Sequence, residues 1–173
     1  GQMNSVQQSR YNKTVQFFTN RVQYMDDLNK DLTTFSRRAR ANGIQPCYRP
    51  NGTSDYPWHN TGIMSLFNEI QFYDYTKIVK RAYETLPENY HLTLSYSEHN
   101  LDYADSVVKA VLDTGVNMAV VFRNKDKPKK FLGLDVIDGD QDDLRFLDPQ
   151  GVVVGLYAKG KAKQDTSGFV IDA

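Results

Sequence analysis

The residues of this chain that could carry out catalysis are few. Cys47 is followed by Asp55 and His59, and a cysteine nucleophile needs a base to take its proton and a third group to orient that base. All three lie in a segment rich in turn residues, where sequence spacing fixes no geometry. A loop thiol without a catalytic role is therefore the favoured interpretation, and a lone cysteine also cannot form an intramolecular disulfide.

Candidate metal ligands are equally sparse. His91 and His99 lie eight residues apart with carboxylates beside the second, but they do not form the HExxH pair of a helical metal site. The acidic run 138–143 resembles the start of an EF-hand loop, yet Asp143 and Pro149 occupy the positions that require glycine and glutamate. A solvated acidic turn fits better, and we expect neither a metal nor a cofactor.

Motifs that bind phosphate or activate a serine are missing from the sequence. It holds no Gly-x-Gly-x-x-Gly, no Walker lysine loop and no Gly-x-Ser-x-Gly. The 21 basic and 21 acidic residues cancel, and the net charge of +4 in residues 1–60 is too small to attract a polyanion. We therefore expect no nucleic-acid partner, and a hydrolytic enzyme of unknown class is only a second alternative.

Aromatic residues gather in the middle of the chain and lead to a ligand-binding prediction. Seven of them lie within 46 residues: Trp58, Tyr73, Tyr75, Tyr83, Tyr90, Tyr96 and Tyr103. Tyrosine offers an apolar face and a hydroxyl to a small ligand, although a half-buried layer between helices and sheet would use the same residues. For a bound small molecule we predict contacts from Trp58, Tyr96, Arg123 and Asp135.

The elements that position these residues begin with a helix predicted over residues 5–42, which contain neither proline nor glycine. One apolar stripe follows heptad spacing: Tyr11, Val15, Phe18, Val22, Met25 and Leu32. A second stripe beside it holds Phe17, Tyr24, Leu28 and Phe35. Two adjacent stripes make a face wider than a coiled-coil seam, which indicates packing on the protein's own body.

The length of this helix leaves two alternatives open. About 38 residues would span about 57 Å, whereas a compact domain of this size is roughly 40 Å across. Either the helix breaks near residues 31–34, which are weak helix formers, or it continues unbroken. An unbroken helix would be a dimerisation element or the continuation of a membrane anchor, so a homodimer through this helix is a possible partnership.

The central segment is predicted to alternate between helix and strand. A loop at 43–62 leads into a helical region at 63–86, and a strand at 91–96 follows. Asn100 is suited to cap a helix at 101–114, which Gly115 would end. An apolar strand at 118–122 then completes a strand–helix–strand unit, whose two strands we expect to be parallel.

The last part of the chain is predicted to form an antiparallel β-meander. Its strands are placed at 131–137, 145–147, 152–157 and 169–171, with turns between them. The predicted fold class is therefore α+β: a long N-terminal helix, further helices, and a C-terminal antiparallel meander in a sheet of four or five strands. Residues 1–43 form the helix and 44–173 the body of one domain overall.

This order of elements is that of membrane-tethered sensor domains of the PAS or Cache type, by architecture only. Segments 131–136 and 146–152 resemble their sheet strands. The function predicted from this analogy is a non-catalytic, extracytoplasmic ligand-sensing or recognition domain. The first alternative is a pilin-like or other structural assembly subunit, in which the N-terminal helix forms the spine of a polymer.

The start of the chain bears on its location. Because the first residue is glycine, either Met3 is the natural start or an N-terminal signal or anchor was removed before Gln2. No run in the sequence approaches the roughly 18 apolar residues of a membrane span. A membrane association would therefore depend on a removed anchor, and we expect a periplasmic or extracellular location over a cytoplasmic one.

Overall fold

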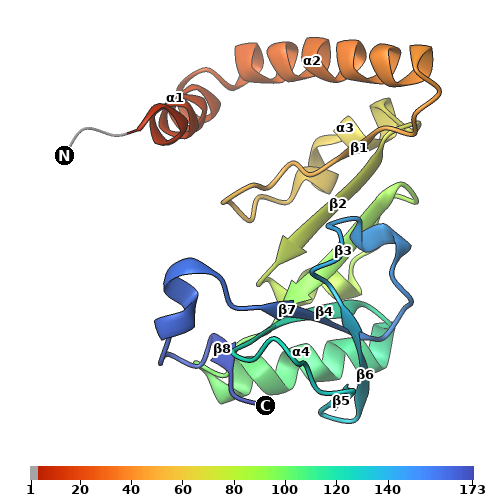
Figure 1. Ribbon diagram of the computed structural model, residues 1–173. Helices are drawn as coiled ribbons and strands as arrows, with labels where there is room; N and C mark the ends of the chain where they lie inside the picture. Colours follow the sequence, from red (N-terminus) through yellow and green to blue (C-terminus); the bar gives the residue numbers. More distant parts are fainter. Residues whose placement is uncertain (1–3) are drawn as a thin grey trace.

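The computed structural model describes residues 4–173, which form a mixed α/β fold around one mostly parallel sheet (Figure 1). The strands are β1 Cys47–Tyr48, β2 Gln71–Thr76, β3 Tyr90–Ser95, β4 Asn117–Phe122, β5 Lys130–Phe131, β6 Leu134–Asp138, β7 Val153–Tyr157 and β8 Val170–Ile171. The α-helices are α1 Ser5–Thr19, α2 Arg21–Ala41, α3 Ile63–Leu66 and α4 Leu101–Thr114. Four 3-10 helices are η1 Trp58–Thr61, η2 Val79–Tyr83, η3 Arg145–Leu147 and η4 Gly160–Gln164.

The sheet runs in the order β1-β2-β3-β4-β7-β6-β5, and β8 pairs with β4. The mixed α/β class is thus confirmed, but the antiparallel meander of four or five strands is wrong. Among the described strands only the β5–β6 hairpin is antiparallel, while β6 is parallel to β7, and both β7 and β8 are parallel to β4. The analogy with PAS and Cache domains loses its basis, since it rested on an antiparallel sheet.

The physical reason for this error is that strand direction is set by the connections. A parallel pair needs a crossover of about a dozen residues, whereas an antiparallel pair can be joined by a tight turn. Residues 139–152 between β6 and β7 make such a crossover, and they contain η3 where a strand was predicted at 145–147. Alternating apolar residues mark β6 and β7 as strands but say nothing about their direction.

The helical prediction for residues 63–86 is wrong for most of its length. Helix α3 covers only its first turn, and β2 and η2 follow. The segment around Tyr73 is rich in aromatic residues, which favour strands. Ile70 is buried and Val79 is partly buried, which mimicked helical spacing, but they pack in different core clusters.

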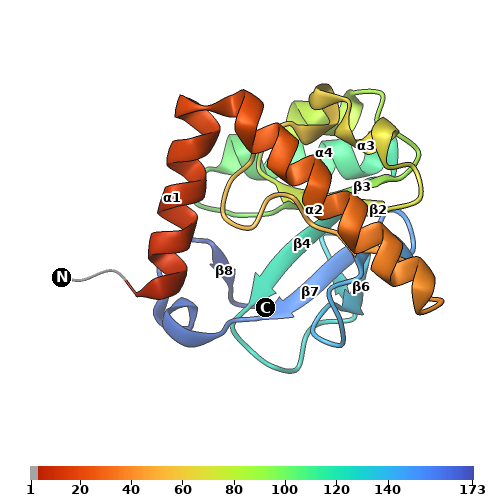
Figure 2. The same cartoon turned by 90° about the horizontal axis from the view of Figure 1, so that it is seen from above.

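The N-terminal region is helical as predicted, but the break falls at Asn20 and not near residues 31–34. Asn20 ends α1 and begins α2, and its side chain accepts a hydrogen bond from the Gln23 amide. Asparagine is among the best residues at a helix start, which outweighs the weak propensity of Thr33 further along. Figure 2 shows α1 turned sharply away from the axis of α2.

The strand–helix–strand unit is confirmed. The Asn100 side chain accepts from the Tyr103 amide at 2.9 Å at the start of α4, and Gly115 ends the helix with a φ of 74°. Strands β3 and β4 are parallel, and β4 lies in the interior of the sheet between β3 and β7. Its nearly continuous burial is typical of a central parallel strand.

Two apolar clusters hold the elements together. The first packs α4 against β3, β4 and β7, and lies around Leu94, Val107 and Val120. The second packs α1, α2 and α3 against β2 and β3, and lies around Leu32 and Phe72. Figure 1 shows α2 and α4 at opposite ends of the molecule, with the twisted sheet between them.

Two observations concern membrane association. Within residues 4–173, no helix has both the length and the apolar content that crossing a bilayer requires. Residues 1–3, on which the two interpretations of the chain start depend, lie outside the described residues.

Candidate binding groove

The carboxyl edge of a parallel sheet is the usual ligand position in α/β folds, but here the chain's own C-terminal segment covers part of it. Arg123, directly after β4, pairs with Asp172 and donates to the backbone oxygens of Lys163 and Asp165 at 2.8 Å. The Glu98 amide, after β3, donates to the oxygen of Gly168 at 2.7 Å. These interactions cover the ends of β3 and β4 with the C-terminal segment.

The acidic turn after β6 is neutralised by lysines. Lys127 lies 2.7 Å from Asp138 and 2.9 Å from Asp140, and Lys159 lies 2.9 Å from Asp140. Burial alone would raise the pKa of Asp140, but hydrogen bonds from the two lysines lower it to about 2. Across residues 4–173, no group of three or more His, Cys, Asp or Glu side chains is placed to hold a metal ion.

A buried polar network fastens the loop before η1 to the sheet. Asp74 on β2 is fully buried and accepts hydrogen bonds from the Asn51 amide and side chain at 3.0 and 2.9 Å. Tyr90 on β3 donates to Asp74 at 3.2 Å and accepts from Arg81 at 2.5 Å. Arg81 in turn donates to Asp55 at 2.6 Å. These hydrogen bonds tie the loop to β2, β3 and η2, although the Nε atom of Arg81 is buried without a partner within residues 4–173.

The same network answers the question of a cysteine nucleophile. Asp55 is engaged by Arg81, and His59 pairs with Glu84 at 2.7 Å, while Cys47 lies on β1. In the structure, the base and the orienting group proposed for the thiol, His59 and Asp55, therefore interact with other residues.

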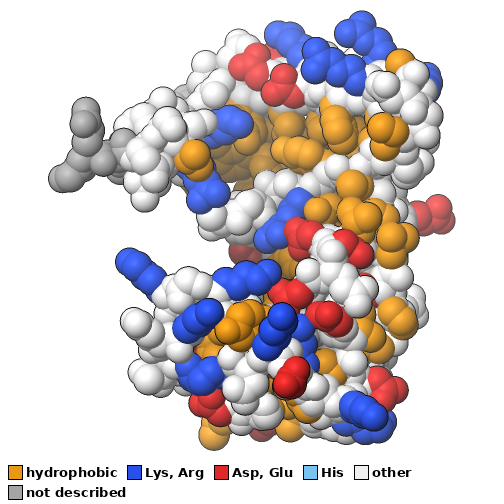
Figure 3. Space-filling model, viewed as in Figure 1, with side chains coloured by type: hydrophobic (Ala, Val, Ile, Leu, Met, Phe, Trp, Pro, Cys, Tyr) orange, Lys and Arg blue, Asp and Glu red, His pale blue; other side chains and the backbone are white. Residues whose placement is uncertain are grey.

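An open groove with a volume of about 630 Å³ lies between α2 and β1. Its walls are Lys13, Gln16, Tyr24, Asp27, Leu28, Asp31, Leu32 and Phe35 from the helices, and Cys47, Tyr48 and Arg49 from the β1 segment. Figure 3 shows hydrophobic side chains gathered beneath α2 and open to solvent, below the charged outer surface of that helix. We call this cavity the α2–β1 groove.

A smaller aromatic pocket of about 150 Å³ adjoins the groove. Its lining is Phe17, Phe18, Tyr24, Tyr56 and Trp58, together with Lys13 and Thr14 of α1 and Pro50 and Ser54 of the loop after β1. The Phe17 ring meets those of Tyr24 and Tyr56 edge-to-face at 5.2 and 5.0 Å. Because Lys13 and Tyr24 line both cavities, the pocket opens beside one end of the groove.

The charges of the groove are unevenly distributed. Asp27 and Asp31 lie one turn apart on the α2 wall. Arg49, on the opposite wall, is already occupied, since it lies 3.2 Å from Asp143 and stacks 4.6 Å from the Tyr75 ring centre. Asp31 has no ion pair and no side-chain hydrogen bond within residues 4–173. The α2 wall therefore offers an unneutralised acidic group.

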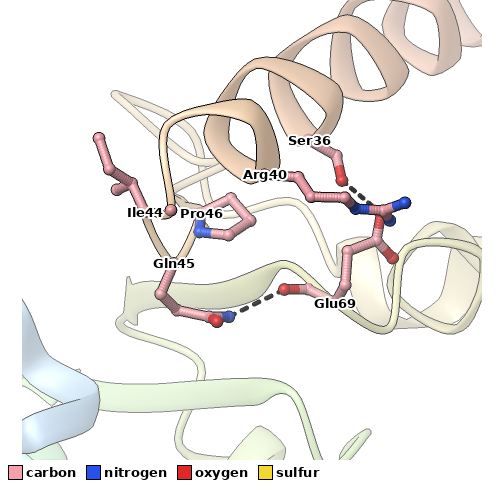
Figure 4. A pocket seen from close by; sticks show the side chains of 7 residues that line it. Ser36, Arg40, Ile44, Gln45, Pro46 and Glu69 are labelled. Atoms are coloured by element: carbon pink, nitrogen blue, oxygen red, sulfur yellow. Dashed lines mark hydrogen bonds between the residues drawn. The ribbon is translucent and has the colours of Figure 1, made fainter.

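A second hollow of about 390 Å³ lies at the C-terminal end of α2 (Figure 4). Ser36 donates to the Glu69 carboxylate at 2.5 Å, and Gln45 donates to the Glu69 backbone oxygen at 2.9 Å. The hydrogen bond from Ser36 lowers the pKa of Glu69 below its ordinary value. The groups of this hollow bind one another, which makes it a weaker candidate than the groove.

The four residues predicted to contact a ligand lie in four different settings. Trp58 lines the aromatic pocket and donates to Asn51. Tyr96 is buried under α4 with its hydroxyl directed to Glu98, and Arg123 is tied to the C-terminal segment. Asp135 is exposed on β6, 2.9 Å from Lys130. The structure does not bring these four side chains together in one site.

Sequence reasoning missed the groove as a site, although its signal was present. The second apolar stripe of the N-terminal region contributes Tyr24, Leu28 and Phe35 to the α2 wall. That stripe was interpreted as packing on the body, which holds for its inner residues only. Phe35 remains 38% exposed, so part of the stripe is unused by the fold.

Comparison with known proteins gives a family and no close relative. No curated protein and no solved structure is significantly similar to this chain. The model of one family, described as Gene product 88, matches residues 1–173, and that description names no activity, ligand or partner. Because the match spans the whole sequence, the chain belongs to the Gene product 88 family.

Proposed function

We propose that this protein is a non-catalytic recognition domain that binds its ligand in the α2–β1 groove. The observation that carries the proposal is an open groove of about 630 Å³ with an aromatic pocket beside it. Ligand sites of proteins have volumes of about 300–1,000 Å³ and combine apolar walls with placed polar groups. The α2–β1 groove lies within this range of volume, and its walls carry both apolar side chains and charged ones.

The lining of the groove favours binding over catalysis. Cys47 is the thiol of the groove, and among the residues that line the groove there is no serine, threonine or histidine. Asp27 and Asp31 lie on an open helix face, where a carboxylate is poorly suited to general acid–base work. A hydrolytic enzyme therefore remains the less favoured alternative.

Panning a random peptide library against the protein tests this proposal. We expect recurrent sequences with large apolar side chains to be selected by the wild type and lost with Phe35→Glu, which places a charge on the groove wall. Phe35 is 38% exposed, so the substitution should leave the fold intact.

The matched control is Leu112→Glu, which places the same charge on an exposed position of α4 outside the groove. It should retain the selected peptides, and thermal melting should show both variants folded. Selection of no groove-dependent sequence, or equal binding by Phe35→Glu, would contradict a recognition function for the groove.

A second candidate, an assembly subunit, is supported by an exposed apolar row on the N-terminal helices. Phe18 and Val22 are 77% and 76% exposed, and Tyr11 and Val15 of the same heptad stripe are also exposed. Such a row is typical of a surface that a second helix covers. The break at Asn20 divides it, so a homodimer would use α1 and the start of α2 at an angle to each other.

Val22→Asp is expected to abolish concentration-dependent dimerisation if this row forms an interface, because a carboxylate there would be buried without a partner. Sedimentation equilibrium of the wild type and the variant measures the effect. A wild type that stays monomeric at high concentration would remove this candidate and leave the groove proposal untouched.

The predicted extracytoplasmic location, membrane tether and homodimer remain predictions. The exposed row gives the homodimer a structural basis, whereas the first two lose the architectural analogy that was one of their grounds, since the sheet is mostly parallel.

A further inference from the structure

The β1 strand forms one edge of the sheet. It pairs only with β2, with Cys47 opposite Gln71 and Tyr48 opposite Phe72. The Gln71 amide donates to the Pro46 oxygen at 3.0 Å, so the Pro46 carbonyl points toward β2. Because successive backbone groups of an extended strand point in opposite directions, the Cys47 carbonyl faces the free edge. The edge is therefore able to pair with another strand.

The groove lies along this free edge. Its wall includes Cys47, Tyr48 and Arg49, three consecutive residues whose side chains alternate between the two faces of the sheet. A cavity lined by consecutive strand residues meets the strand at its edge, since a cavity on one face would be lined by every second residue. Figure 1 shows β1 beneath α2, and residues of α2 line the opposite side of the groove.

We infer that the groove binds an extended peptide segment that adds to β1 as a further strand, an inference that rests on the proposed recognition function. A sheet edge facing a helix across an apolar groove is a known geometry for strand addition, in which backbone hydrogen bonds supply affinity and alternate side chains supply specificity. Pro46 and Pro50 bound the edge, so the added strand is short.

The side chains of the groove define the chemistry of this peptide. Asp27 already lies 3.8 Å from Lys30 and accepts hydrogen bonds from two glutamines. Asp31, one turn further along the same wall, has no ion pair within residues 4–173 and can pair with a cation of the ligand. The aromatic pocket beside Lys13 and Tyr24 has room for a large apolar side chain. The partner is therefore an extended segment with a lysine or arginine facing α2 and an aromatic or large aliphatic residue at one end.

Peptides selected in the panning experiment provide the test when they are resynthesised with single N-methylated amides. Strand addition predicts that methylation at every second position weakens binding about tenfold, the equivalent of about one lost hydrogen bond. Methylation at the intervening positions should have little effect. A peptide bound as a helix or through side chains alone would not show this alternation.

Charge recognition is tested with Asp31→Asn, an exposed position whose substitution should not affect folding. The variant should weaken binding of a lysine-containing peptide several-fold and leave binding of its norleucine analogue unaffected.

Peptides that depend on the groove but show no alternation on N-methylation would overturn strand addition while the recognition function stands. No groove-dependent peptides at all would overturn both.

Discussion

Replacing Arg81 with methionine is expected to lower the free energy of unfolding by about 3 kcal/mol. Arg81 is 1% exposed and donates hydrogen bonds to Asp55, Thr76 and Tyr90. Removing one partner of a buried ion pair costs about 3–5 kcal/mol, because the other partners lose their compensation. We expect the lower end of this range, since the Asp55 side chain is 30% exposed and can regain water.

Urea denaturation at neutral pH measures this change, and Lys80→Met is the matched control. Lys80 is the neighbouring residue in η2 and is exposed, so its substitution should change stability by less than about 0.5 kcal/mol. If Arg81→Met lowered the free energy of unfolding by no more than the small change expected of Lys80→Met, the network around Arg81 would contribute little to stability. The prediction also bears on the loop carrying Trp58, because Arg81 holds that loop through Asp55.

The stability difference between the wild type and Asp74→Asn is expected to depend on pH. Burial raises the pKa of Asp74 to about 6, against hydrogen bonds from Asn51 and Tyr90 and the charge of Arg81, which lower it. The ordinary pKa of this carboxyl is 3.8, so between about pH 4 and pH 6 the folded state holds a proton that the unfolded state has released. The stability that Asp74 contributes is therefore complete below about pH 4 and is lost as the pH rises toward 6.

A shift of about two pKa units corresponds to about 3 kcal/mol, which sets the expected size of the change. The variant cannot titrate at this position, so the free energy of unfolding of the wild type minus that of the variant should fall by this amount between pH 4 and pH 7. Urea titrations at these pH values measure it, and contributions from all other groups cancel in the difference. A constant difference would show that Asp74 keeps its ordinary pKa in the folded protein.

Asp140→Asn provides a control of opposite sign. Its pKa is lowered to about 2 despite burial, because of the hydrogen bonds from Lys159 and Lys127. Stability contributed by Asp140 is therefore present above its ordinary pKa and is lost as the pH falls toward 2. The two variants should respond to pH in opposite directions, which separates the effect of burial from the effect of ion pairing.

The candidate site was only partly predictable from sequence. Trp58 was named as a ligand contact and does line the aromatic pocket, and Tyr24, Leu28 and Phe35 were recognised as one stripe. The opposite wall is formed by Cys47 and its neighbours, which follow in the chain only after the whole of α2. Nothing in either segment indicates that they face each other, because the separation of the two walls depends on how α2 packs on the core.

Sequence by itself determined the elements whose signals are local. The cap residues of α4, the alternation in β3, the apolar run of β4 and the helical character of residues 5–41 each depend on neighbours within a few positions. Helix starts, helix ends and strand patterns are decided at that range, since capping hydrogen bonds and side-chain periodicity involve adjacent turns or residues.

The tertiary structure alone decided the direction and order of the strands, the position of α2 and the existence of the groove. Strand β7 lies beside β4, and β1 lies at the edge, because the crossovers and the two apolar clusters favour that arrangement. These outcomes depend on contacts between residues far apart in the chain. A pattern of apolar residues shows which side chains must be buried, but it does not show which partners will bury them.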